Sequence, residues 1–61
     1  MPIVTVKILE GRTDEQKRAL VEKVTEAVSE TVNAPKERVS VCIEEMAKTN
    51  FGVAGVRMSD Q

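Results

Sequence analysis

The order of apolar and polar residues predicts the elements of this chain, beginning with an alternating stretch at residues 3–9. One side of this stretch carries the β-branched residues Val4, Val6 and Ile8, which is the period-two pattern of a strand. The other side is also largely apolar and comprises Ile3, Thr5, Lys7 and Leu9. We therefore expect both faces of this strand to be covered, the second of them by another subunit.

A helix is predicted to follow the strand. Thr13 and Gln16 have the spacing of a capping box, in which each side chain binds the backbone N–H of the other residue. The helix runs to about Val32, and one apolar stripe comprises Leu20, Val21, Val24, Ala27, Val28 and Val32. Asn33 suits a left-handed C-cap, and Pro35 stops the helix.

A second strand is predicted at residues 39–45, where Val39, Val41 and Ile43 alternate with more polar positions. A strand, a helix and a strand in this order form a βαβ unit with parallel strands. Glycines at turn spacing predict a short C-terminal β-hairpin within residues 50–56. We interpret residues 1–61 as a single domain of the α/β (α+β) class.

The length of the chain predicts an assembly of several copies. A chain of 61 residues buries too little surface to be stable alone without disulfides, metal or oligomerisation. One cysteine and no histidine exclude an internal disulfide and disfavour a structural zinc site. We therefore expect an obligate homo-oligomer that needs neither metal nor cofactor.

Charge and composition exclude several kinds of partner. Nine basic and ten acidic residues give a net charge of −1, whereas a nucleic acid or an anionic membrane selects a basic face. Phe51 is the only aromatic residue, so platforms for stacking bases or flat cofactors are missing. No apolar run approaches the ~20 residues of a membrane span, and no signal peptide is visible. We expect a cytoplasmic protein, in keeping with its single thiol.

Pro2 is the first candidate for chemistry. Removal of Met1 would leave Pro2 with a free secondary amine, and free α-amino groups have pKa values of about 7.7–8.0. An apolar site or a nearby arginine would favour the neutral amine. A base poised near neutral pH suits proton transfer, and the chain offers no histidine for that task. A proline at the start of a strand is also common for structural reasons.

Other polar residues give weaker indications. Arg12 follows the glycine that ends the first strand, at the strand edge where open α/β sheets bind ligands, and its guanidinium suits a carboxylate. Cys42 is interpreted as a core residue, because no histidine is present to activate it. Glu44 and Glu45 are adjacent on a strand and point to opposite faces, so surface ion pairs are expected of them. Phe51 is either a core residue or the apolar wall of a pocket.

Several motifs occur together in one order. They are Pro2 behind a removable methionine, Leu9-Glu10-Gly11-Arg12 with Asp14-Glu15-Gln16-Lys17, Ala34-Pro35, and Glu45-Met46-Ala47-Lys48 with Phe51-Gly52. This ordered set, over nearly the whole chain, resembles the 4-oxalocrotonate tautomerase family. The resemblance implies a βαβ fold with a C-terminal hairpin, assembled as a hexamer of three dimers.

The resemblance also implies a reaction and its residues. In the family, an amino-terminal proline moves a proton from the 2-hydroxyl of 2-hydroxymuconate to C5, giving the conjugated 2-oxo-3-hexenedioate. Carried onto this chain, Pro2 is the base and then the acid, and Arg12 of a neighbouring subunit binds the distal carboxylate. Phe51 supplies an apolar wall, and Leu9 lines the same pocket.

One position departs from the family. The family has a second arginine, between two valines, that binds the 2-oxo acid end of the substrate; this chain has Ser40 there. Arg38 is close in sequence but is not an automatic substitute, and Arg57 of the tail is a candidate replacement. Loss of one charge-assisted contact costs about 1.5–3 kcal/mol. The sequence therefore predicts either a weaker enzyme on dicarboxylates or another enol or 2-oxo acid as substrate.

Two alternatives remain open from the sequence. The first is a hydratase or dehalogenase of unsaturated acids on the same scaffold, with a protonated Pro2 and with Glu44 or Glu45 activating water. The second is a small oligomeric ligand-binding protein without catalytic activity, such as a flavin store. The missing tryptophan and tyrosine count against the second alternative.

Overall fold

A computed structural model describes all residues from Met1 to Gln61. Its helix and strands are, in order, β1 (Ile3–Leu9), α1 (Asp14–Val32), β2 (Ser40–Met46), β3 (Gly52–Val53) and β4 (Val56–Arg57). Three single 3₁₀ turns are η1 (Lys36–Arg38), η2 (Lys48–Asn50) and η3 (Met58–Asp60). The order of elements is as predicted, with β2 displaced by one residue. Val39 does not join the strand, because its N–H donates to the carbonyl of Lys36 in η1 at 3.1 Å.

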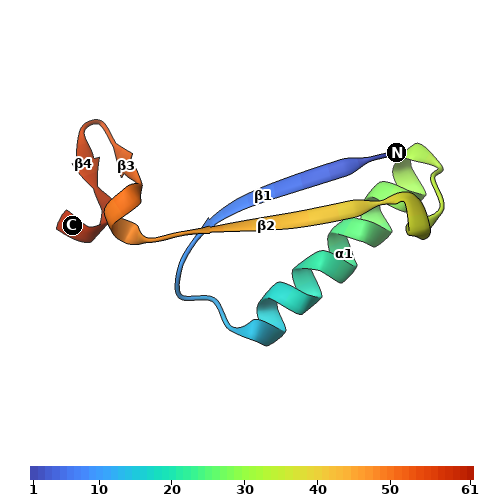
Figure 1. The fold of residues 1–61 in the computed structure, drawn as a ribbon, viewed down its shortest axis with the longest axis horizontal. Helices are drawn as coiled ribbons and strands as arrows, with labels where there is room; N and C mark the ends of the chain where they lie inside the picture. Colours follow the sequence, from blue (N-terminus) through green and yellow to red (C-terminus); the bar gives the residue numbers. More distant parts are fainter.

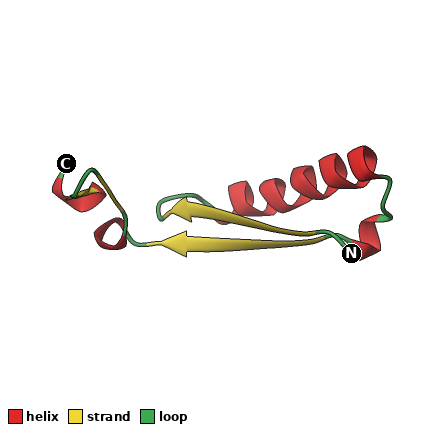
Figure 2. Cartoon of the chain, turned by 90° about the horizontal axis from the view of Figure 1, so that it is seen from above, coloured by secondary structure: helices red, strands yellow, loops and turns green.

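The predicted βαβ unit is confirmed. Strands β1 and β2 are parallel, with Ile3 opposite Ser40 and Leu9 opposite Met46 at the two ends of the ladder. Helix α1 lies along one face of this two-stranded sheet, and no other element covers the opposite face (Figure 2). We call the uncovered side the open face; its residues are Ile3, Thr5, Lys7, Ser40, Cys42 and Glu44.

The two faces of the sheet differ in exposure. Val4 and Val6, on the helix side of β1, are half-buried, whereas Ile3 on the open face is 73% exposed. Cys42 is exposed as well, opposite Thr5, so a single chain gives it no core, and its interpretation as a core residue depends on a second chain that covers this face. The reason is that the sheet has only one helical layer to cover it.

A single copy of the chain has no core of its own, since none of its 61 residues is buried. Its radius of gyration is 14.4 Å, whereas a compact chain of this length has about 10.5 Å. Its accessible surface is 4758 Å², against about 3,900 Å² expected for a compact monomer of this mass. A chain without a core of its own therefore depends on contacts with other chains to bury its apolar side chains.

Local signals define both ends of α1 as predicted. The N–H of Gln16 donates to Thr13 Oγ1 at 3.1 Å, and the N–H of Thr13 donates to Gln16 Oε1 at 2.9 Å, which completes the capping box. Asn33 closes the helix in the left-handed region, at φ 56°, with its N–H bonded to the carbonyl of Ser29.

No helix in the structure is both long and apolar enough to span a membrane.

The C-terminal tail, residues 47–61, extends beyond the carboxyl ends of β1 and β2 (Figure 1). It contains the predicted hairpin, in which Gly52 pairs with Arg57 and Val53 with Val56. The two turn residues, Ala54 and Gly55, both have positive φ (55° and 83°), as a tight hairpin with right-handed twist requires. The tail thus forms a separate small lobe at one end of the sheet.

The capping box yields a first prediction. We expect Thr13→Ala to lower the free energy of unfolding by about 1 kcal/mol, because the N–H of Gln16 loses its acceptor. Thr13→Ser keeps an acceptor hydroxyl and is the matched control. Urea unfolding at one fixed protein concentration measures the difference, since oligomer stability depends on concentration. Equal stability of the alanine and serine variants would contradict the prediction.

Candidate active site

Pro2 and Ser40 are neighbours at the amino ends of the two long strands. The carbonyl of Pro2 accepts the N–H of Ser40 at 3.0 Å, and Pro2 itself is half-buried. With Met1 attached, the Pro2 nitrogen belongs to a tertiary amide and has no basic lone pair. A basic amine at this place therefore requires removal of Met1. Ser40 is the position at which, by the sequence resemblance, the family has its second arginine.

Arg12 and Leu9 lie at the other end of β1. The strand has seven residues, so its first and last residues lie about 20 Å apart at the usual rise per residue. Gly11, at φ 115°, turns the chain out of β1, and the capping box begins immediately after Arg12. Glycine and cap together hold Arg12 in a short, defined loop between β1 and α1.

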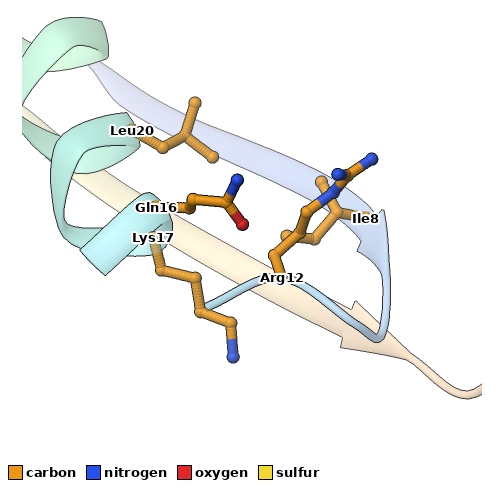
Figure 3. Close-up of a pocket in the computed structure, with 5 residues that line it drawn as sticks. All are labelled: Ile8, Arg12, Gln16, Lys17 and Leu20. Carbon is orange, nitrogen blue, oxygen red and sulfur yellow. The ribbon is translucent and has the colours of Figure 1, made fainter. Parts of the chain in front are cut away.

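A shallow hollow adjoins Arg12. It has a volume of about 250 Å³ and is lined by Ile8, Arg12, Gln16, Lys17 and Leu20 (Figure 3). Lys17 is engaged, because its Nζ pairs with Glu45 Oε2 at 2.8 Å. Arg12 makes no side-chain hydrogen bond or ion pair within the chain, so its guanidinium is free to bind a carboxylate.

Phe51 and Arg57 lie in the tail. Phe51 is exposed in the single chain, so it belongs to no core there. Its carbonyl accepts the N–H of Met58 at 2.8 Å, which ties the two ends of the hairpin together. Arg57 donates to both carboxylate oxygens of Asp60, at 3.0 and 3.3 Å. A substrate carboxylate would have to compete with Asp60 for this guanidinium.

The predicted site residues therefore occupy three places in one chain. Pro2 and Ser40 lie at the amino ends of the strands, Leu9 and Arg12 at the carboxyl end of β1, and Phe51 with Arg57 beyond it. Figure 1 shows the N-terminus and the tail at opposite ends of the long axis. One chain does not bring Pro2 together with Arg12 or Phe51.

The acidic residues of β2 form the ion pairs that the strand pattern predicted. Glu44 pairs with Lys7 on the open face at 3.8 Å, and Glu45 pairs with Lys17 on the helix side at 2.8 Å. They point to opposite faces and lie in the half of β2 far from Pro2. This chain alone gives the hydratase alternative no carboxylate beside Pro2.

Two features escaped prediction from the sequence. Arg38 belongs to η1 and not to a strand, so strand alternation does not fix its direction. Glu10 accepts the backbone N–H of Lys48 at 3.2 Å, across 38 positions of sequence. No sequence pattern predicts the contact between Glu10 and Lys48, because Glu10 is, from the sequence, only a polar residue at the end of a strand.

Comparison with known proteins identifies the family. The family model described as "Tautomerase enzyme" matches residues 2–61. The 2-hydroxymuconate tautomerase of Bacillus subtilis (strain 168) is 68% identical over 60 residues, covering 98% of this chain and 97% of the relative. The chain belongs to the tautomerase family, as its sequence motifs indicated, and it is an enzyme of the isomerase type.

Solved structures agree with the fold. The crystal structure of YwhB, a homologue of 4-oxalocrotonate tautomerase, is 67% identical and superimposes with a TM-score of 0.95, covering 98% of both chains. A heterohexameric 4-oxalocrotonate tautomerase from Chloroflexus aurantiacus J-10-fl is 30% identical, with a TM-score of 0.94 and coverage of 98% and 97%. Membership of an enzyme family counts against the alternative of a ligand store without activity.

Proposed function

We propose that this tautomerase converts 2-hydroxymuconate or a similar enol acid into its conjugated 2-oxo isomer, with Pro2 as the general base after Met1 is removed. It works as a homo-oligomer, a hexamer built as a trimer of dimers, in the cytoplasm. The name of the Bacillus subtilis relative supports the substrate class, and the Chloroflexus aurantiacus heterohexamer supports an assembly of six subunits.

The separation of Pro2 from Arg12 carries this proposal. Both residues border β1, one at each end, and neither is buried in one chain. Two copies whose strands run antiparallel bring the amino end of one β1 beside the carboxyl end of the other. Such twofold pairing is self-complementary, so it forms two equivalent sites, each with Pro2 of one copy and Arg12 of the other.

The chemistry needs one mobile proton. The neutral Pro2 amine takes the proton of the substrate's 2-hydroxyl, and electrons move through the diene toward C5. The Pro2 ammonium then returns the proton to C5, so the base is regenerated and no electron is gained or lost. Arg12 of the neighbouring copy stabilises the negative charge that develops toward the distal carboxylate. Phe51 of a neighbouring copy keeps the amine in an apolar setting, which favours its neutral form, and Leu9 lines the same pocket.

At the Pro2 end of the proposed site, position 40 carries no positive charge to bind the 2-oxo acid end of the substrate. Ser40 contributes a hydroxyl and no charge there. Arg57 reaches a neighbour's site only by leaving Asp60. We therefore assign the main carboxylate contact to Arg12, with Ser40 and Arg57 as auxiliary binding residues.

A comparison of protein with and without Met1 tests directly whether Pro2 is the base. We expect protein that retains Met1 to turn over 2-hydroxymuconate on the order of 10²–10⁴-fold more slowly than trimmed protein, since a tertiary amide cannot accept the proton. Intact mass defines each preparation, and the ultraviolet absorbance of the dienol follows the reaction. Equal rates for the two forms would exclude Pro2 as the base.

Mixed oligomers test whether the site is shared between chains. Pro2→Ala and Arg12→Ala are each expected to be poorly active alone. After the two variants are unfolded and refolded together, about one quarter of the sites should combine an intact Pro2 with an intact Arg12 from different copies. Recovery of activity toward that level supports a shared site. If both residues acted from one chain, every site in the mixture would be defective and no activity would return.

Position 40 tests how the substrate is held. We expect Ser40→Arg to raise kcat/KM for 2-hydroxymuconate about tenfold, because one added charge-assisted contact gives roughly that factor. Ser40→Met, similar in length and uncharged, is the control and should give no gain. Steady-state kinetics compare the variants. A loss of kcat/KM with arginine would show that this end of the pocket no longer accommodates the family's second contact.

A further inference from the structure

The tail is tied together internally. The N–H of Asn50 bonds to the carbonyl of Ala47 at 2.9 Å, and the N–H of Met58 bonds to the carbonyl of Phe51 at 2.8 Å. Arg57 and Asp60 add a bidentate ion pair. The position of Phe51 is therefore set by how the tail as a whole joins the βαβ unit.

Glu10 provides that junction. Its Oε1 accepts the N–H of Lys48 at 3.2 Å, at the first residue of η2. Its own N–H donates to the carbonyl of Met46, the last residue of β2, at 2.8 Å, which extends the ladder by one bond beyond β1. Apart from the bond from the Glu10 carboxylate, no hydrogen bond or ion pair joins residues 47–61 to residues 1–46.

The same residue borders the loop that carries Arg12. A second hollow, of about 420 Å³, is lined by Leu9, Glu10, Gly11, Arg12 and Lys48. Glu10 thus lies between two parts of the chain that, in the proposed function, both contribute residues to the active site of a neighbouring copy. These parts are the loop with Arg12 and the tail with Phe51, which lie at the same end of the sheet (Figure 1).

We propose that Glu10 is a positioning residue, whose carboxylate holds the tail against the β1–α1 loop so that Phe51 and Arg12 reach the substrate together. The assignment rests on the proposed function. Glu10 acts as a hydrogen-bond acceptor for Lys48, and its negative charge is not required. The amide oxygen of Gln at position 10 therefore suffices, whereas Ala leaves the Lys48 N–H without its acceptor.

The hydrogen bond between the Lys48 N–H and the Glu10 carboxylate can also be removed by changing its donor, Lys48. Lys48→Pro deletes the N–H, and proline is tolerated at the first position of a helical turn. The preceding residue, Ala47, already has φ −67° and ψ 147°, which suits a residue before proline. Lys48→Ala keeps the N–H and removes the side chain, so it is the matched control.

The first readout is independent of activity. Fluorophenylalanine incorporated in place of phenylalanine labels Phe51 alone, because the chain has one phenylalanine. We expect the ¹⁹F resonance of the trimmed oligomer to shift or broaden in Glu10→Ala and Lys48→Pro. It should keep its wild-type position and width in Glu10→Gln and Lys48→Ala. An unchanged resonance in both disrupted variants would overturn the proposal.

The second readout is catalysis. Glu10→Ala and Lys48→Pro should each lower kcat/KM for 2-hydroxymuconate about tenfold, and the double variant should lose no more than either single one, since both remove one bond. Glu10→Gln, Lys48→Ala and the remote control Glu30→Ala should stay within about twofold of wild type. Equal losses in Glu10→Gln and Glu10→Ala, or additive losses in the double variant, would overturn the proposal.

The two proposals fail in different ways. If protein retaining Met1 is as active as trimmed protein, the proposed function is wrong, while the ¹⁹F comparison still reports whether Glu10 fixes the tail. If trimming controls activity but the Glu10 and Lys48 variants match wild type in both readouts, only the assignment of Glu10 is wrong.

Discussion

The open face of the two-stranded sheet is the constraint on which the rest of this structure depends. Helix α1 covers one side, and no residue of the single chain becomes buried. Burial of apolar surface is the dominant favourable term in folding, at about 25 cal/mol per Å². A chain that completes no core by itself must gain this term through contact with other copies. Folding and assembly are therefore coupled in this protein.

The same constraint shapes the chemistry of the proposed site. Pro2 and Arg12 border opposite ends of β1, and Phe51 lies in a tail beyond the sheet. In the proposed assembly, the contacts between copies that cover the exposed face of the sheet are also those that gather these residues. The stability of the fold and the geometry of the proposed site then depend on the same contacts.

The sequence predicted those features that depend on residues close together in the chain, and missed those that depend on residues far apart. The boundaries of β1 and α1 came from local signals, such as the alternation after Pro2 and the capping box at Thr13. For Cys42, alternation indicated the face of the sheet on which it lies but not what covers that face, and the single chain leaves it exposed. The bond from Glu10 to Lys48 spans 38 positions and depends on how the tail leaves β2, which no local pattern encodes.

Position 40 links the fold to substrate choice. The N–H of Ser40 donates to the carbonyl of Pro2, so the backbones of the two residues are neighbours at the amino ends of the strands. A serine there offers one hydroxyl, while Arg57 is held by Asp60 and Arg12 is free. In the proposed mechanism, binding energy is therefore concentrated at the distal carboxylate, where charge accumulates in the transition state. An interaction placed there raises the rate of proton transfer more than tight binding of the ground state does.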